Sequence, residues 1–375
     1  KSYVREDYKK KKFGAAAEDV CKDFTRAERI MAINNPMMQF CVYAGMVFVL
    51  SFGSYAVISS QGLEVNVGQM SAIITYSFQI LMSLMMLSMV FVMITMSMES
   101  AERIVEVLQE QSTLTSPEKA VKEVKDGSID FDGVSYKYSR TAERNALEHV
   151  DLHIRSGELI GILGGTGSSK TTLVQLIPRL YDVTEGAVRV GGVDVRNYDL
   201  ETLRDNVAMV LQKNVLFSGT IKDNLRWGNP NATDEEMYEA CRLAQADEFI
   251  QQFPDKYDTW IEQGGSNVSG GQKQRLCIAR ALLKKPKVLI LDDSTSAVDT
   301  HTDALIRQGF REFIPDTTKI IIAQRVASVE DADRIIVMDG GRISAIGTHE
   351  ELLKSNEIYR EVYTSQTKAG DHDEA

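Results

Sequence analysis

The sequence predicts two structural parts: a membrane-spanning α-helical hairpin, followed by an α/β domain with a largely parallel sheet and an inserted helical subdomain. The first observation is the charge distribution, because residues 31–63 and 65–98 contain no Asp, Glu, Lys or Arg, whereas the rest of the 375-residue chain is densely charged. The second is that short apolar strands alternate with helical segments from Ser128 onward, a pattern typical of α/β domains. The two parts are therefore expected in different solvents.

Two apolar segments, residues 37–59 and 70–96, each exceed the roughly 20 residues that a helix needs to cross a bilayer. The short link at residues 61–67 predicts a hairpin whose outer ends lie on one side. Basic residues flank these outer ends, at residues 9–12 and Arg103, and favour the cytoplasmic side. We therefore expect a multi-pass protein of the cytoplasmic membrane, in contact with membrane lipids. The alternative is a buried hairpin of a soluble protein.

Composition narrows the class of protein and its partners. The net charge of -11 argues against nucleic acid as a partner, since duplex binding needs a basic face. Four cysteines stand far apart without metal-ligand spacing, so neither a disulfide framework nor a zinc site is indicated. The chain opens without an initiator Met in a helical pattern, and we expect it to be the C-terminal part of a longer polypeptide.

The expected organisation has four parts. Residues 1–100 form the end of a transmembrane domain, 101–127 a linker, 128–368 the α/β domain, whose motifs below mark it as nucleotide-binding, with a helical subdomain at about 214–280, and 369–375 a tail.

The elements of the α/β domain follow from runs of apolar residues and their spacing. Strands are expected at residues 129–138, 146–154, 158–164, 187–195, 287–291 and 319–324, with a final hairpin at 334–347. Helices are expected from Lys170, across 220–253, over 302–314 and at the C-terminus. The loop between the strand that ends before Lys170 and the helix that begins there is the part of the sequence most informative about function.

This junction contains a glycine-rich loop that matches the phosphate-binding P-loop pattern at all but one position. Backbone N–H groups of such a loop form a nest for phosphate oxygens, the lysine reaches the β- and γ-phosphates, and the hydroxyl of the next residue binds Mg²⁺. The ATP-binding candidates are Gly164, Gly165, Thr166, Gly167, Ser168, Ser169, Lys170, Thr171 and Thr172. Ser169 stands where the pattern has Gly, and its Cβ is expected to crowd a backbone that must lie close to phosphate.

Two further motifs follow the P-loop. Asp292 ends an apolar strand, where a carboxylate is expected to hold Mg²⁺ and its water shell. Before it, Ser269 is placed to cap a helix whose first residues are Gly270 and Gly271, which makes a second anion site. Since this helix lies in the helical insertion, the second site fits a phosphate presented by another subunit.

These motifs together resemble the nucleotide-binding domain of ATP-binding cassette (ABC) transporters. The preceding hairpin is similar to the last two of six transmembrane helices in an ABC exporter half. The resemblance implies ATP and Mg²⁺ as cofactors, with Tyr138 stacked on adenine and Gln212 in contact with Mg²⁺ beside Thr171 and Asp292. It also implies that Ser269, Gly270, Gly271 and Gln272 contact the γ-phosphate of ATP on the opposite subunit, with a D-loop from Ser296 to Asp299 between the two sites.

Three positions depart from the family pattern. Asp293 stands where the family has the Glu that polarises the attacking water, Gln324 replaces the switch His, and Gln263 replaces a Glu before the signature motif. Asp is shorter than Glu by about 1.5 Å of reach, and a misplacement of about 1 Å can cost on the order of a hundredfold in rate. Glutamine can donate a hydrogen bond but cannot become cationic. The pair predicts a site that binds ATP and hydrolyses it slowly.

The functional hypothesis is ATP-driven export by one half of a heterodimeric ABC transporter. In this hypothesis the chain's own site is degenerate, and its signature motif completes a competent site on a second half-transporter. A homodimeric exporter with slow hydrolysis stays open, as do a soluble ATPase of the chromosome-maintenance type and a regulatory nucleotide binder. The transported substrate can be a small molecule, a lipid or a peptide.

Overall fold

The computed structural model describes residues 5–61, 63, 65–139, 141–294 and 297–370, with the side chains of 30, 31, 34, 35 and 368–370 left out of the description. The chain divides into two compact units, Lys1–Gln111 and Ser112–Ala375. Each unit is described by itself.

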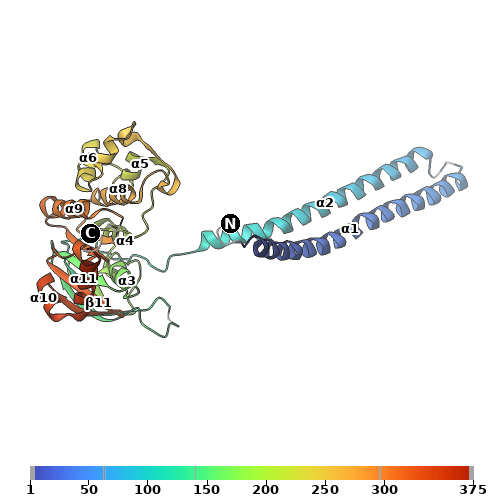
Figure 1. The fold of residues 1–375 in the computed structure, drawn as a ribbon. Coiled ribbons are helices and arrows are strands. Elements are labelled where there is room, and N and C mark those ends of the chain that lie inside the picture. The colour runs from blue at the N-terminus through green and yellow to red at the C-terminus, as the bar shows by residue number, and fades with distance from the viewer. Residues whose placement is uncertain (1–4, 62, 64, 140, 295–296, 371–375) are drawn as a thin grey trace. The chain divides into compact units, whose positions relative to one another are not determined.

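The first unit is a pair of long helices, α1 (Glu6–Ser59) and α2 (Val67–Gln109), packed side by side (Figure 1). Asn66 caps α2 reciprocally with Gln69: the Gln69 N–H donates to Asn66 Oδ1 at 2.9 Å, and the Asn66 N–H donates to Gln69 Oε1 at 3.0 Å. At about 1.5 Å per residue, α1 and α2 are roughly 80 and 65 Å long. Both helices therefore continue well beyond a bilayer core of about 30 Å.

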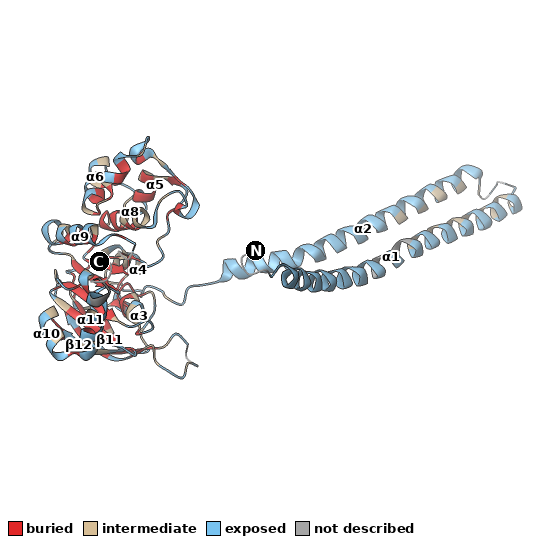
Figure 2. Cartoon of the chain, in the orientation of Figure 1, coloured by how far each residue is buried: buried red, intermediate tan, exposed pale blue. Residues whose placement is uncertain are grey.

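Helices α1 and α2 hold the two candidate membrane spans found among the described residues, Pro36–Ser59 and Val67–Gln109. None of their described residues is buried within the chain, and the pair accordingly shows no red in Figure 2. Burial of apolar surface is the main force that stabilises soluble folds. The described residues of this hairpin bury no apolar side chain within the chain, so its apolar surface requires contact with lipid or with other helices.

The second unit contains a six-stranded sheet in the order β12-β11-β3-β10-β9-β6. Its strands are β3 (Leu159–Gly164), β6 (Val207–Val210), β9 (Val288–Asp292), β10 (Thr318–Ile322), β11 (Arg334–Asp339) and β12 (Arg342–Gly347). Neighbouring strands are parallel except for β12, which pairs antiparallel with β11. The prediction of a largely parallel sheet is confirmed for this part of the domain.

The first strands of the domain form a separate antiparallel sheet in the order β2-β1-β4-β5. These strands are β1 (Ile129–Tyr136), β2 (Leu147–Ile154), β4 (Glu185–Val190) and β5 (Val193–Asp194). Apolar residues on their inner faces, such as Phe131 and Val188, share one core with the strands of the parallel sheet. Alternation of apolar residues identified these strands but not the sheet that they join.

Helices cover the parallel sheet and build a second lobe (Figure 1). The sheet lobe carries α3 (Lys170–Gln175), α4 (Leu200–Asn206), α9 (Thr300–Phe313), α10 (His349–Ser355) and α11 (Glu357–Gly370). The helical lobe contains α5 (Ile221–Arg226), α6 (Asp234–Leu243), α7 (Asp247–Gln251), α8 (Gly270–Leu282) and the short pair β7 (Gly219–Thr220) and β8 (Trp260–Ile261). Single 3₁₀ turns lie at Val195–Asn197, Lys256–Asp258, Gln263–Gly265 and Val326–Ser328.

The segment that composition marked as a linker, residues 101–127, contains two different structures. Its first residues extend α2 to Gln109, while residues 112–124 lie on the second unit. Ser116 Oγ donates to Asp199 Oδ1 at 3.0 Å, and Val121 pairs with Tyr198 in a parallel bridge. A polar, proline-containing composition gave no sign of this docking, because it depends on backbone groups presented by α4 and the turn before it. The expected tail, 369–375, begins inside α11, which extends to Gly370, and residues 371–375 lie outside the described residues.

Candidate nucleotide site

The P-loop connects β3 to α3 at the carboxyl end of the sheet. Gly164 lies against the chain, since an added Cβ would come within 2.3 Å of the Met338 carbonyl oxygen. Gly165 and Gly167, in contrast, face open space, because an added Cβ there would meet nothing within 4 Å. Lys170 Nζ donates to the carbonyl oxygens of Gly164 and Gly165, each at 2.8 Å. The loop is therefore a concave backbone surface with a lysine folded across it, a shape that suits phosphate.

Ser169, the position at which the motif departs from Gly, has φ 70 and ψ 24. This is the left-handed region, which glycine enters freely and a residue with a Cβ enters at a cost of about 1 to 2 kcal/mol. The sequence predicted crowding of phosphate by the Ser169 Cβ. The structure shows that the substitution also strains the backbone at the N-terminus of α3.

Asp292 ends β9 directly beside the P-loop helix, as the sequence predicted. Thr171 Oγ1 donates to Asp292 Oδ1 at 3.1 Å. Burial raises the pKa of Asp292, with a further contribution from the Asp293 carboxylate, while the Thr171 hydrogen bond and Lys170 act in the opposite direction. Burial also lowers the pKa of Lys170, against the attraction of both aspartates.

The oxygen donors of Thr171 and Asp292 fit Mg²⁺, which prefers oxygen ligands and keeps several waters. Among the described residues, no group of three His, Cys, Asp or Glu side chains converges to hold a metal ion. A metal ion here would therefore need phosphate oxygens and water to complete its coordination, which is the usual arrangement for Mg²⁺ at nucleotide sites.

Asp293 directly follows β9, and side chains that follow the two neighbouring strands reach it. It is buried, has φ 48, and receives two side-chain hydrogen bonds at the same oxygen, Oδ2. Gln212 Nε2, in the loop after β6, donates at 3.1 Å, and Gln324 Nε2, after β10, donates at 2.7 Å. Since β6 and β10 are the two neighbours of β9, the parallel topology itself gathers these residues. The structure thus brings together three of the residues selected from the sequence.

Tyr138 follows β1, and its side chain reaches the P-loop helix α3. Its hydroxyl lies 2.8 Å from Thr172 Oγ1, and its ring makes edge contacts with Tyr136 and Tyr181. The Tyr138 residue is 58% exposed, whereas Tyr136 is 4% exposed and burial raises its pKa to about 12. Tyr136 is therefore a core residue, and Tyr138 is the tyrosine that can offer a ring to a ligand at the P-loop.

The signature residues form the N-terminus of α8 in the helical lobe. Ser269 and Gln272 make a reciprocal capping box, in which the Gln272 N–H donates to Ser269 Oγ at 3.3 Å and the Ser269 N–H donates to Gln272 Oε1 at 2.9 Å. Ser269 and Gly270 are exposed, and the first turn of α8 has no acidic residue. The exposed N–H groups and the helix dipole can bind an anion.

The second signature glycine has a packing role. A Cβ at Gly271 would lie 2.8 Å from the carbonyl oxygen of Ala297, in the D-loop. The Ala297 N–H also donates to Oε1 of the buried Gln274 at 3.1 Å. Asp299 caps α9 through the Thr302 N–H at 2.9 Å, whereas Ser296 lies outside the described residues. Sequence reasoning missed Gln274, although a polar residue on the buried side of α8 was the available signal.

A groove lies beside the loop that carries Gln212. It has a volume of about 340 Å³, and its lining includes Phe217, Trp227 and Arg280. The rings of Phe217 and Trp227 stack at 4.7 Å, and the Arg280 guanidinium lies 5.9 Å from the centre of the Phe217 ring. Trp227 is 64% exposed, so the groove presents apolar surface to its surroundings.

Comparison with known proteins supports the relationship seen in the motifs. The model of the ABC transporter family matches residues 147–296, and that of the ABC transporter transmembrane region matches residues 1–85. Together these ranges cover more than half of the chain. The uncharacterized ABC transporter ATP-binding proteins YknU of Bacillus subtilis and Rv1273c of Mycobacterium tuberculosis are 36% and 39% identical to it, each over 98% of this chain.

Two further comparisons concern export. A putative multidrug export ATP-binding/permease protein of Bacillus subtilis, YgaD, is 41% identical over 73% of this chain and 47% of its own length. The structure of a bacterial Atm1-family ABC exporter with ATP bound is similar with a TM-score of 0.87 and 29% identity, covering 97% of this chain and 64% of that one. The chain spans 62% and 63% of the lengths of YknU and Rv1273c.

The helical hairpin matches the ABC transporter transmembrane region, which confirms the predicted membrane location, with the α/β domain on the cytoplasmic side. The same match contradicts the alternative of a soluble ATPase. Three features agree with the two matched models: the apolar hairpin, the P-loop beside Asp292 and the capped signature helix. The chain belongs to the ABC transporter family, and it contains transmembrane helices joined to a nucleotide-binding domain.

Proposed function

We propose that this chain is one half of an ATP-driven exporter that pairs with a different half-transporter, and that its own P-loop site binds ATP but hydrolyses it slowly. The observation that carries the proposal is the double hydrogen bond to Asp293 Oδ2, from Gln212 at 3.1 Å and Gln324 at 2.7 Å. The carboxylate that replaces the usual Glu is already engaged by two amides.

The residues around the P-loop fit MgATP. Lys170 would exchange the carbonyl oxygens of Gly164 and Gly165 for phosphate oxygens, which its flexible chain permits. Thr171, Asp292 and Gln212 would hold Mg²⁺, which neutralises charge on the phosphates when bound. The exposed ring of Tyr138, held by its hydrogen bond to Thr172, would stack on adenine.

Slow hydrolysis follows from the position of the Asp293 carboxylate, which stands where the general base would act. A general base must approach within about 3.2 Å of the proton that it removes, and Asp293 is shorter than Glu while one of its oxygens already accepts from two amides. Gln324 donates a hydrogen bond to this carboxylate but cannot supply the positive charge of a protonated His. Binding is therefore retained while activation of water is weakened.

The signature helix has no corresponding defect, which favours a heterodimer over two identical subunits. Ser269 caps α8, Gly270 is exposed, and Gly271 is free of the Cβ that would strike Ala297. In the proposed dimer this helix end completes the ATP site of the partner. Closure of the two nucleotide-binding domains would move the membrane helices through a segment seated in the groove of Phe217, Trp227 and Arg280.

A homodimer with two slow sites is the second candidate, since Asp293 keeps a carboxylate beside the proposed Mg²⁺ ligand Asp292. A regulatory nucleotide binder is the third. The transported substrate is a small molecule, a lipid or a peptide, and the multidrug name of the relative YgaD favours testing drugs first.

The deciding experiment purifies the full-length protein from native membranes and identifies any partner subunit that copurifies. We expect a second half-transporter in equal amount and vanadate-sensitive ATP turnover only with that partner present. Robust turnover by the chain alone would favour the homodimer. ATP binding without turnover in either preparation would favour the regulatory binder.

A further inference from the structure

We propose that Gln366, on the C-terminal helix α11, is a positioning residue that holds the switch residue Gln324 at the nucleotide site. The inference rests on the proposed role of Gln324 near the γ-phosphate. It adds a residue that no motif of the sequence marked, located 42 positions after the switch.

The geometry is a two-point contact between one side-chain amide and the backbone of the switch loop. Gln366 Nε2 donates to the carbonyl oxygen of Gln324 at 2.7 Å, and Gln366 Oε1 accepts from the N–H of Val326 at 2.9 Å. A primary amide can donate and accept at once. The two bonds therefore fix the backbone on both sides of Arg325, and with it the direction of the Gln324 side chain.

Helix α11 is anchored firmly enough to serve as a support. Tyr359 in its first turns is fully buried, its hydroxyl lies 2.7 Å from His349 Nδ1, and its N–H donates to Asn356 Oδ1 at 2.8 Å. Gln366 follows Tyr359 by seven residues, which places both on one face of the helix. The face of α11 that carries the buried Tyr359 thus also carries Gln366, itself exposed, to the switch loop.

Helix α9 holds the next residue of the same loop. The Arg307 guanidinium is buried, pairs with Asp303 at 3.2 Å and donates to the carbonyl oxygen of Ala327 at 3.0 Å. Two helices therefore hold the loop that follows β10, while the Gln324 side chain extends from it to Asp293 at 2.7 Å. A shift of α11 would displace Gln324 from Asp293.

The test measures backbone hydrogen exchange of residues 322–329 in the full-length membrane protein. Gln366→Met removes both hydrogen bonds at similar side-chain length, and we expect the Val326 amide to exchange about two- to tenfold faster. Gln366→Glu keeps the acceptor, so Val326 should stay protected while the bond to the Gln324 carbonyl is lost. The control is Gln308→Met, because exposed Gln308 bonds only within its own helix, to Glu312 at 2.8 Å, among the described contacts.

Unchanged exchange of Val326 in Gln366→Met, or an equal increase in Gln308→Met, would overturn the proposal. A second measurement uses the variant Asp293→Glu with Gln324→His, in which turnover is expected to be measurable. Adding Gln366→Met should lower its turnover number about two- to tenfold and leave the half-saturating ATP concentration unchanged. Absence of turnover in that background would mean that Ser169 or residues of the partner keep the site slow, whereas the exchange experiment decides the role of Gln366 independently.

Discussion

At the scale of single residues, the nucleotide site contains two non-glycine residues in the left-handed backbone region, Ser169 with φ 70 and Asp293 with φ 48. Such conformations persist where surrounding structure holds them, and they gather at functional sites. Asp tolerates this region better than most residues, which helps to explain its presence after β9. Ser169 has no such advantage, so its strain is open to experiment.

Replacing Ser169 by Gly should relieve this strain. We expect Ser169→Gly to stabilise the nucleotide-free protein by up to about 1 kcal/mol, after the greater chain entropy of glycine in the unfolded state is subtracted. Thermal unfolding measures the gain, and ATP titration shows whether the relaxed loop binds more tightly. Ser169→Ala is the matched control because it removes the hydroxyl and keeps the Cβ; an equal gain from Ala would show that strain is not the cause.

Restoring the usual base and switch should raise ATP turnover. We expect Asp293→Glu with Gln324→His to increase the turnover number of the assembled transporter on the order of tenfold, because the carboxylate gains reach and the switch can carry charge. The control is Asp293→Gln with Gln324→His, because glutamine has the side-chain length of glutamate but no carboxylate that can act as a base. No gain over wild type would mean that Ser169 or residues of the partner keep the site slow.

The buried charge of Asp292 predicts a pH-dependent stability. Because burial raises its pKa in the folded state, the stability contributed by protonated Asp292 is complete below its unfolded pKa of about 3.9 and is lost as pH rises through the folded pKa. Asp292→Asn keeps an acceptor for Thr171 and removes the charge. Its melting temperature should therefore exceed that of wild type increasingly as the pH rises from about 4 through the folded pKa of Asp292.

Asp299 provides the comparison of opposite sign. The Thr302 N–H lowers the pKa of Asp299, so the ionised form contributes stability that is present above its ordinary pKa and lost as pH falls. Asp299→Asn should therefore show no gain at neutral pH. A parallel gain in both variants would contradict the burial argument for Asp292.

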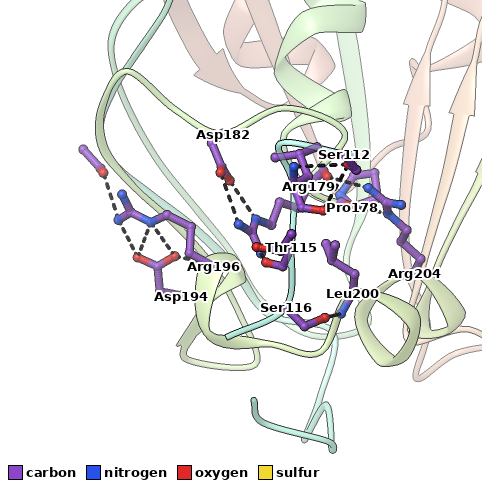
Figure 3. Close-up of polar contacts among 12 residues, drawn as sticks. Ser112, Thr115, Ser116, Pro178, Arg179, Asp182, Asp194, Arg196, Leu200 and Arg204 are labelled. Carbon is purple, nitrogen blue, oxygen red and sulfur yellow. Dashed lines mark hydrogen bonds and ion pairs between the residues drawn. The ribbon is translucent and has the colours of Figure 1, made fainter. Parts of the chain in front are cut away.

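At the scale of elements, the segment between the membrane helices and the domain is tied to the turn after the P-loop helix (Figure 3). Arg179 is buried and binds Asp182 through Nε at 2.7 Å and through its second terminal nitrogen at 3.1 Å. Its other terminal nitrogen donates to the Thr115 carbonyl oxygen at 3.1 Å. The chain that leaves α2 is therefore attached to the element that follows the nucleotide loop.

Loss of Arg179 should release this segment. We expect Arg179→Ala to destabilise the domain by about 1 to 3 kcal/mol, since it removes a buried guanidinium that bonds the exposed Asp182 and leaves the Thr115 carbonyl without its charged donor. Faster proteolysis within residues 112–124 and a lower melting temperature measure the effect. Arg189→Ala is the control, because its pair with Asp132 is about half exposed and is worth about 0 to 1 kcal/mol. Similar losses in both variants would contradict a special role for Arg179.

At the scale of the whole molecule, the two units differ in what stabilises them. Residues 112–370 build their own apolar cores, whereas no described side chain of α1 or α2 is buried within the chain. The helices therefore depend on lipid and on other membrane segments, while the nucleotide-binding domain has its own core. Within the second unit, the contact of Arg179 with Thr115 holds the start of the domain chain against the turn after α3.

The sequence by itself determined the class of each part and most of the nucleotide site. Lys170, Thr171 and Asp292 could be selected because their chemistry depends on short motifs, and the spans because a bilayer imposes length and apolarity on any helix that crosses it. Local patterns of this kind need no knowledge of distant residues. They also revealed the departures at Ser169, Asp293 and Gln324.

Only the tertiary structure decided which distant residues meet. The strand order β10-β9-β6 brings Gln324 and Gln212 to one oxygen of Asp293, and strand order is not written in the pattern of any single strand. Gln366 and Thr115 gained their roles through contacts with backbone groups, which every residue carries and which no motif distinguishes. The sequence could therefore identify the site's chemistry, while its supports depended on how remote segments pack.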